Sequence, residues 1–254
     1  MQWGVVAFID VMGFKGMWQR GHGAPDVLDA LTRTRDRASE LAKRQNAEGG
    51  GDLWHHTEIE VRTFSDTVVV LSPMPAHTDY RPTADDEKAF HDAVRRYMLL
   101  RFVVLLMSKV VTEAAADEPP LLYRGSIAAG DFQANSFAFL GPAIDEAGKF
   151  FEAAEGAFVF LAPSAADVFR ARPGLLGRAL FEYFVNYSIP LKRDASLKTM
   201  ALNPLMFLDP DKRADHSLRI LAYFGAEAAD KQLEAKRHNT REFLEFVGKH
   251  WLMN

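Results

Sequence analysis

The sequence predicts an α+β domain, in which helices pack on a sheet of mainly antiparallel strands. Three stretches predict it. The apolar run Val5–Ile9 is typical of a buried strand, and Glu58–Leu71 contains an alternating segment followed by a second apolar run, as in a hairpin. The stretch from Asp85 to about Thr112 is apolar on nearly all sides near its middle, as in a helix buried in a core.

The N-terminal half predicts a strand, a helix and a hairpin. The first strand ends at Asp10, where a turn punctuated by glycine begins. Pro25 suits the first turn of a polar-faced helix that runs to about Ala47. In the hairpin, Ser65 and Asp66 are the turn residues between the two strands.

The rest of the chain predicts a strand, a helix and further short elements. In order, these are strand 121–132, helix 143–154, strand 158–161, helix 165–171, a hairpin of strands 184–192 and 197–207, and helices 210–224 and 226–247. The order β-α-β-β-α-β is that of the ferredoxin-like split unit, in which the helices stack on one face of the sheet. We expect 1–209 to form the main domain and 210–254 a helical extension that packs on it.

Composition excludes several classes of protein. The chain has 254 residues, a formal net charge of -4 and no cysteine. No overall basic surface indicates a nucleic-acid partner, and thiol catalysis and cysteine-ligated zinc are excluded. The longest apolar stretch, Tyr97–Val111, contains Arg101 and Lys109 and is too short and too charged to span a bilayer. These properties fit a cytoplasmic protein with no membrane partner.

Two carboxylates are expected to meet at one end of the sheet. In a βαββ unit the end of the first strand lies beside the hairpin turn, so Asp10 and Asp66 come together. Two carboxylates in one place repel each other unless a cation lies between them. Mg²⁺ or Mn²⁺ binds in this way, and substrate phosphates complete its ligand shell. Free N–H groups of the turn after Asp10 can bind phosphate.

Four motifs in order give the chain a family resemblance. They are AFIDVMGFKGM at the first strand, FSDTVVVL at the hairpin, YRGSIAAGDF after the long helix, and FLGPAIDEAGKFFEAAE around the next helix. With these motifs the chain resembles the catalytic domains of class III nucleotidyl cyclases, over about Val5 to Leu205.

The resemblance implies two divalent ions, Mg²⁺ or Mn²⁺, per site. It implies Asp10, Ile9 and Asp66 as metal-site residues, and a phosphate-binding turn formed by Met12, Gly13 and Phe14. It also implies a head-to-tail homodimer in which the two subunits share each active site.

The same resemblance assigns residues that contact the other parts of a nucleoside triphosphate. The last hairpin offers Lys192 or Lys198 for the triphosphate. Asp145 stands where the family usually has a ribose-orienting Asn, and Lys149 where it usually has a transition-state Arg. Lys keeps the charge of Arg but loses its fork geometry.

Within this family the chain is most similar to the pyrimidine cyclases of Pycsar anti-phage systems, whose cyclic product activates a partner effector. The base-reading positions hold Arg62 and Ala138. Arg has only donors, so it favours the O4 acceptor of uracil over the amine of cytosine. We therefore expect UTP to be converted to 3′,5′-cyclic UMP.

Alternatives remain open. Arg62 could instead pair with Glu60 and never meet the base. The chain could then be a cytidylate or purine cyclase. The replaced Asn and Arg positions also allow a degenerate domain that binds a nucleotide without turnover. A polymerase-palm or diguanylate-cyclase relative is a weaker alternative, because the GGDEF-type turn is absent.

Overall fold

The computed structural model describes residues 1–12, 23–48, 58–75, 85–171, 183–223 and 231–251. Within these ranges the strands are β1 (Gln2–Val11), β2 (Glu60–Phe64), β3 (Thr67–Pro73), β4 (Tyr123–Ala134), β5 (Phe139–Leu140), β6 (Val159–Leu161), β7 (Phe184–Leu191) and β8 (Ala195–Leu202). The helices are α1 (Ala24–Glu48), α2 (Asp85–Ala116), α3 (Pro142–Ala153), α4 (Pro163–Arg170), α5 (Pro210–Tyr223) and α6 (Lys231–Trp251).

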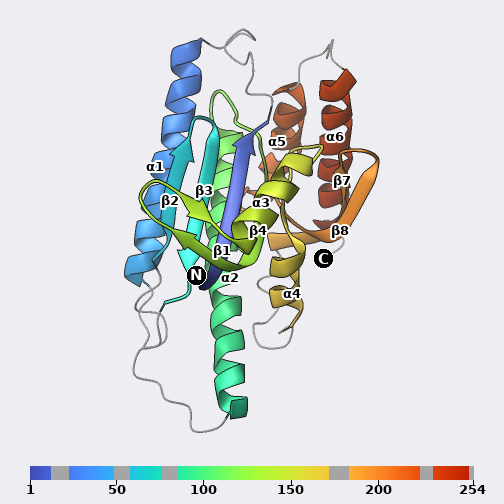
Figure 1. The fold of residues 1–254 in the computed structure, drawn as a ribbon. Helices are drawn as coiled ribbons and strands as arrows, with labels where there is room; N and C mark the ends of the chain where they lie inside the picture. Colours follow the sequence, from blue (N-terminus) through green and yellow to red (C-terminus); the bar gives the residue numbers. More distant parts are fainter. Residues whose placement is uncertain (13–22, 49–57, 76–84, 172–182, 224–230, 252–254) are drawn as a thin grey trace.

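The described strands form a single sheet in the order β2-β3-β1-β4-β6-β8-β7, and β5 pairs with β4 outside this path (Figure 1). Neighbouring strands are antiparallel except β4 and β6, which run parallel. β1 lies between β3 and β4, which is why its end can meet residues from both. The predicted α+β fold class is confirmed.

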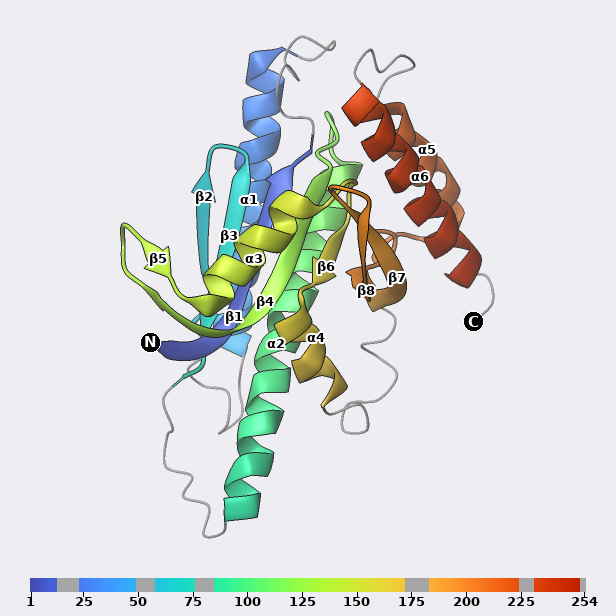
Figure 2. The ribbon, with the colours of Figure 1, turned by 45° about the vertical axis from the view of Figure 1, so that its right-hand side comes forward.

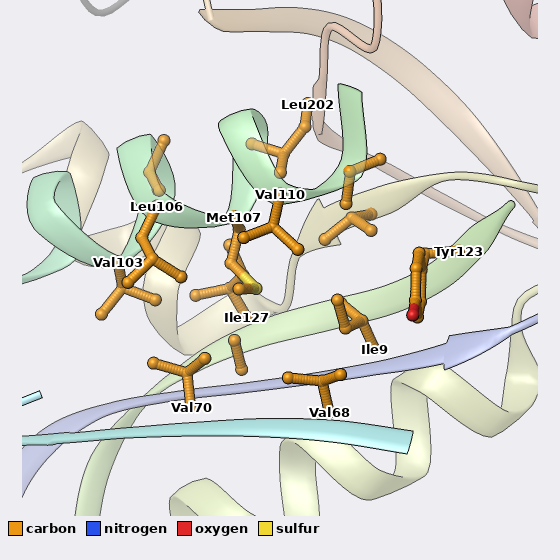
Figure 3. Close-up of a cluster of buried hydrophobic side chains, with 14 of the residues drawn as sticks. Ile9, Val68, Val70, Val103, Leu106, Met107, Val110, Tyr123, Ile127 and Leu202 are labelled. Carbon is orange, nitrogen blue, oxygen red and sulfur yellow. The ribbon is translucent and has the colours of Figure 1, made fainter. Parts of the chain in front are cut away.

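Alternation along β1 separates the two faces of the sheet. Val5, Ala7 and Ile9 point into the large core formed with α1, α2 and α4. Figure 3 shows this core, in which α2 presents side chains such as Met107 and Val110 to the sheet. Burial of this apolar surface is the main source of stability for the arrangement.

The opposite face of the sheet is covered by α3. Ala143, Ile144 and Ala147 of this helix pack against Val6 of β1 and Ala128 of β4. Figure 2 shows α3 on the side of the sheet away from α1 and α2. The expectation that the helices stack on one face therefore does not hold for α3. Its three small or branched apolar residues lie at helical spacing, so they form a narrow stripe that fits closely onto the sheet.

The C-terminal helices contact two parts of the sheet domain. α6 packs on β7 and on the residue before β6, where Phe243 lies 5.0 Å from Tyr187 and 5.5 Å from Phe158 between ring centroids. A second cluster joins Ile220 of α5 and Leu244 of α6 to the end of β1. The boundary at 209 stays a prediction. No helix among the described residues has the length and apolarity needed to cross a bilayer.

The short strand β5 was not predicted. It forms the return side of an arm that extends β4 beyond the body of the sheet, with Gln133 opposite Leu140 (Figure 2). At the arm's tip, Asn135 accepts hydrogen bonds from the N–H groups of Phe137 and Ala138, each at 2.9 Å. A strand of two residues is too short for its alternation to be recognised in a sequence.

Candidate active site

The end of β1 carries Asp10 on the α3 face of the sheet. The register places Asp10 opposite Thr67 of β3 and opposite Arg124 of β4. Its position follows from the alternation of β1, because Val6 and Phe8 point to the same face. The Asp10 side chain is only 16% exposed, so its charge needs partners.

Asp66 lies at the turn between β2 and β3, next to Asp10. The main chain of Ser65 takes a positive φ of 57° at this turn, and the N–H of Val11 donates to the carbonyl of Asp66 at 3.3 Å. The Asp66 side chain is within hydrogen-bonding reach of the Asp10 carboxyl group. The structure therefore brings the two predicted carboxylates together.

The surroundings of Asp10 raise its pKa above the ordinary value. Burial is the largest cause, and the neighbouring charge of Asp66 adds to it. Arg124 and a 3.1 Å hydrogen bond from the Thr67 hydroxyl oppose the shift without cancelling it. The two carboxylates are therefore held in an arrangement that is short of positive charge.

The donor set fits a hard divalent cation. Carboxylate oxygens are the ligands that Mg²⁺ and Mn²⁺ prefer, and a cation between Asp10 and Asp66 would remove their repulsion. Across the described ranges, no group of three or more acidic, histidine or cysteine side chains could hold a metal. Among the described residues, the site thus offers two carboxylates to a metal.

Arg124 is a site residue whose role was not predicted from the sequence. Its Nη2 donates to Asp10 Oδ2 at 3.3 Å, and its Nη1 donates to the carbonyl of Ala154 at 3.5 Å. The guanidinium group also lies over the ring of Phe151, 5.7 Å from its centroid. It lay within a recognised motif, but its contact with Asp10 depends on the β1–β4 register, which the sequence does not supply.

The main chain after Asp10 is partly engaged within the protein. The N–H of Met12 donates to the carbonyl of Leu122 at 2.7 Å, so in this conformation it does not face a phosphate. The Ile9 side chain is fully buried in the core on the opposite face of the sheet from Asp10. A metal could therefore bind only the main-chain carbonyl of Ile9. Gly13 and Phe14 lie outside the described residues.

Asp145 and Lys149 lie four residues apart on the exposed side of α3. The buried side of the helix, which faces its own sheet, carries other residues. The Lys149 ammonium group lies 5.6 Å from the centroid of the Phe150 ring. The structure therefore does not bring these two side chains to the Asp10 carboxylate of the same chain.

Arg62 of β2 points to the α3 face and forms a bidentate pair with Glu60. Nε and Nη2 of Arg62 donate to the two Glu60 carboxylate oxygens at 2.8 and 3.0 Å. The guanidinium group also lies 5.8 Å from the centroid of the Phe139 ring. The arm thus brings the Phe139 ring beside Arg62, and Ala138 precedes Phe139 in the chain. The two base-reading assignments stay predictions.

Lys192 lies in the turn between β7 and β8, beside the end of α3. Its N–H donates to the carbonyl of Ala153 at 2.9 Å, and its side chain is exposed. Lys198 lies in β8, opposite Ser188 of β7. Of the two lysines, Lys192 is therefore the one whose main chain binds the end of α3. The same end of α3 lies beside Arg124.

Comparison with known proteins supports the fold but not a sequence family. No family model and no curated protein sequence matches the chain. The dimeric guanylyl cyclase domain of the RhoGC fusion protein from the aquatic fungus Blastocladiella emersonii superposes with a TM-score of 0.50 at 10% identity, covering 80% of this chain and 96% of that one. The chain has the fold of a nucleotidyl cyclase catalytic domain.

Two further solved structures are similar to the chain. The catalytic core of a rhodopsin-guanylyl cyclase with converted specificity, in complex with ATPαS, gives a TM-score of 0.49 at 14% identity and covers 79% of this chain and 94% of that one. The adenylyl cyclase CyaB from P. aeruginosa gives 0.41 at 13% identity, covering 79% and 93%.

Proposed function

We propose that this protein is a cytoplasmic nucleotidyl cyclase that converts UTP to 3′,5′-cyclic UMP and pyrophosphate. The observation that carries the proposal is the pair of Asp10 and Asp66 at the open end of β1, with the pKa of Asp10 raised. On a nucleotidyl cyclase fold, such a pair is suited to hold divalent cations against a triphosphate.

The chemistry is an intramolecular displacement at phosphorus. The ribose 3′-hydroxyl loses its proton to water and its oxygen bonds to the α-phosphorus. The bond between the α-phosphorus and the oxygen that bridges it to the β-phosphorus breaks, and its electron pair leaves with pyrophosphate. When bound, Mg²⁺ or Mn²⁺ would lower the pKa of the 3′-hydroxyl and offset phosphate charge. Asp10 and Asp66 would hold the ions, and Arg124, already beside Asp10, would add positive charge at the same place.

The second subunit would complete the site. Asp145 and Lys149 lie on the exposed side of α3, away from their own sheet, where they can reach a partner. Lys149 would offset charge on the transferring phosphoryl group and Asp145 would orient the ribose. The exposed tip of the arm supports a partner contact, because Phe137 is 92% exposed and Leu140 54%. A closed two-fold homodimer satisfies both features.

The choice of UTP rests on Arg62. Its pair with Glu60 uses Nε and one N–H of Nη2. Among the described residues nothing accepts from Nη1, which can therefore donate to the O4 of uracil. Cytosine would present an amine donor at that position. A mismatch of this kind costs about 1–3 kcal/mol, or roughly ten- to a hundredfold in discrimination. By resemblance to Pycsar cyclases, the product would then act as a messenger for an anti-phage effector.

The pair with Glu60 also favours a second candidate. If Glu60 keeps Arg62 away from the base, the specificity is set elsewhere, and a cytidylate or purine cyclase becomes the better interpretation. A nucleotide-binding domain without turnover is the further alternative, because Lys149 lacks the fork of Arg.

The deciding experiment is competition among equal concentrations of the four nucleoside triphosphates with Mn²⁺, followed by identification of the products. We expect mainly cyclic UMP, with cyclic CMP as the minor product, and no product from Asp66→Asn protein. Mainly cyclic AMP or GMP would refute the pyrimidine assignment, and mainly cyclic CMP would refute the role of Arg62. Nucleotide binding with no product would favour the inactive alternative.

A matched substitution tests Arg62 directly. Arg62→Met keeps the length and apolar body of the side chain but removes every donor. We expect the preference for UTP over CTP to fall roughly ten- to a hundredfold, because UTP loses its hydrogen bond to Arg62 and CTP loses the mismatch. An unchanged preference would show that Arg62 serves only its pair with Glu60.

A further inference from the structure

The connector, defined here as residues 153–157, begins at the last residue of α3 and lies just before β6. It contacts the last hairpin, Arg124 of β4 and α6. The Glu155 N–H donates to the carbonyl of Pro190 at 3.0 Å, and the Ala153 carbonyl accepts from Lys192 N–H at 2.9 Å. The Ala154 carbonyl accepts from Arg124 Nη1. The connector therefore touches the last hairpin on one side and the Arg124 guanidinium group on the other.

Two side chains of α6 bind the connector's main chain. Asn239 Nδ2 donates to the carbonyl of Glu155 at 2.7 Å. The Ala157 N–H donates to Thr240 Oγ1 at 2.9 Å, and Thr240 Oγ1 itself donates to the carbonyl of Lys236 at 2.7 Å. Thr240 is only 1% exposed, so water cannot replace its hydroxyl group without rearrangement.

The same helix also packs at the other side of the site. Leu244, one turn after Thr240, belongs to the buried cluster that contains Met12, two residues beyond Asp10. α6 thus shares a buried cluster with Met12, the residue after β1, and forms hydrogen bonds with the connector. Arg124 and its partner Asp10 lie between these two supports.

We propose that Asn239 and Thr240 are positioning residues of the active site. α6 holds the connector in place through these two side chains, and the connector sets the positions of Arg124 and of Lys192 relative to Asp10. Neither α6 residue touches substrate. The inference rests on the proposed function, because it assumes that Arg124 and Lys192 provide positive charge to the phosphates of a nucleoside triphosphate.

The test compares three variants. Thr240→Val keeps the shape of the side chain but leaves the Ala157 N–H without its acceptor. Thr240→Ser keeps the hydroxyl group and is the rescue variant. Thr112→Val is the matched control, because Thr112 is also 1% exposed and donates one hydrogen bond, to the Pro204 carbonyl, away from the connector.

We expect Thr240→Val to raise KM about five- to twentyfold for the nucleoside triphosphate that the protein turns over fastest. Displaced phosphate-binding groups weaken substrate binding, whereas a loss of folded protein lowers the apparent kcat and leaves KM unchanged. KM should return to within about twofold of wild type in Thr240→Ser and stay there in Thr112→Val. An unchanged KM in Thr240→Val would overturn the proposal.

A binding measurement separates this inference from the proposed function. Inorganic triphosphate with Mg²⁺ is titrated into each full-length protein by calorimetry, with no turnover involved. Weaker binding in Thr240→Val than in Thr112→Val supports the inference even if no cyclic nucleotide is ever made. Equal affinities, or no binding to the wild type, would overturn it.

A second variant covers the possibility that Thr240→Val does not fold. Asn239→Ala removes only the bond to the Glu155 carbonyl, and Asn239 is half-buried, so folding should tolerate the change. We expect the same direction of change in KM and in triphosphate affinity, by about two- to fivefold. Wild-type values of both in folded Asn239→Ala protein would contradict the role given to α6.

Discussion

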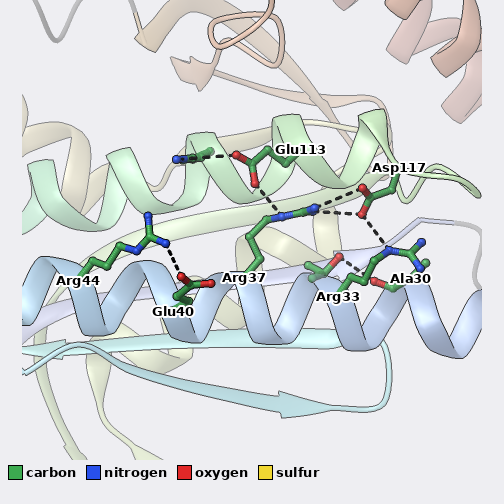
Figure 4. A network of polar contacts seen from close by, with 9 residues as sticks. Ala30, Arg33, Arg37, Glu40, Arg44, Glu113 and Asp117 are labelled. Atoms are coloured by element: carbon green, nitrogen blue, oxygen red, sulfur yellow. Dashed lines mark hydrogen bonds and ion pairs between the residues drawn. The ribbon is translucent and has the colours of Figure 1, made fainter.

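Two clusters of charged side chains lie on opposite faces of the sheet and differ in their charge balance. On the α1–α2 side, Arg37 pairs with Glu113 at 2.7 Å and with Asp117 at 3.1 Å, and Arg33 lies 3.7 Å from Asp117 (Figure 4). In that cluster, called balanced here, each carboxylate has at least one cationic partner, because Lys109 also lies 3.8 Å from Glu113. The site at the end of β1 joins two carboxylates to one guanidinium group.

The pKa values reflect this difference. In the α1–α2 cluster burial opposes the charge of Arg37, but the hydrogen bond and charge of Asp117, followed by Glu113, outweigh it and raise the pKa of Arg37. At the site, burial and Asp66 together raise the pKa of Asp10. The balanced cluster stabilises its charged form and contributes to the fold, whereas the unbalanced one is costly until a cation arrives. Such a deficit is a physical signature of a binding site.

The largest expected effect comes from removing one charge from the unbalanced site. Asp66→Asn changes the shape little, yet we expect turnover to fall by about two orders of magnitude or more, because one metal ligand loses its charge. Without metal the variant should be at least as stable as wild type, since a repulsion is gone. Turnover is measured with Mn²⁺, and stability by urea unfolding with a chelator present.

Glu113→Gln is the matched control for Asp66→Asn, because it removes one carboxylate from the balanced cluster. Here we expect unchanged turnover and a lower stability. The pKa of Asp10, followed by NMR, should fall toward its ordinary value only in Asp66→Asn. Near-normal turnover in Asp66→Asn would end the two-carboxylate assignment.

The second prediction concerns the positive charge that the site lacks within one chain. If Lys149 acts on the site of the partner, inactive Asp10→Ala and inactive Lys149→Ala subunits should complement each other. In a mixed dimer one site collects both lesions and the other has neither. Random exchange would restore up to about a quarter of wild-type activity, because half the dimers are mixed and each has one good site. Persistent inactivity despite demonstrated exchange would place each site within a single chain.

The two clusters also differ in how far the sequence predicts them. The strand end at Asp10 and the hairpin turn at Asp66 are local signals, so their meeting could be predicted from the order of elements. The contact of Arg124 with Asp10 can be predicted only if the register between β1 and β4 is known, and the position of α3 only if the face of the sheet that it covers is known. Neither the register nor the face is a local property of the sequence. The pair of Arg62 with Glu60 could be predicted as an alternative, because side chains two residues apart share a strand face.

The third prediction measures the balanced cluster by itself. Arg37→Met removes the charge that faces Glu113 and Asp117, whose side chain is only 16% exposed. We expect a loss of about 1–3 kcal/mol in the free energy of unfolding, measured with urea, and no change in turnover. The control is Arg44→Met, which breaks the exposed pair with Glu40 in the same helix and should cost about 0.5 kcal/mol or less. Equal losses in both variants would show that the α1–α2 cluster has no special role in stability.

The smallest expected effect concerns His216, a buried titratable side chain that needs no charged partner because it stays neutral. His216 of α5 is 5% exposed, and its Nε2 has no hydrogen-bond partner among the described residues. Burial is the main cause that lowers its pKa, the charge of Arg219 adds to this, and Asp215 opposes it. The unfolded chain then binds a proton more readily than the folded one.

Stability should therefore rise with pH in the window that ends near the ordinary histidine pKa of about 6.5, and this contribution should be constant above it. The measurement is urea unfolding of wild type and His216→Gln across that window, since the difference isolates this residue from Asp10. The slope should be shallower in His216→Gln than in wild type. If the slope in His216→Gln equals that of wild type, the folded and unfolded chains bind a proton at His216 equally well. His216 would then be charged inside the fold at low pH, and the contact of α5 with the end of β1 would contain an unbalanced cation.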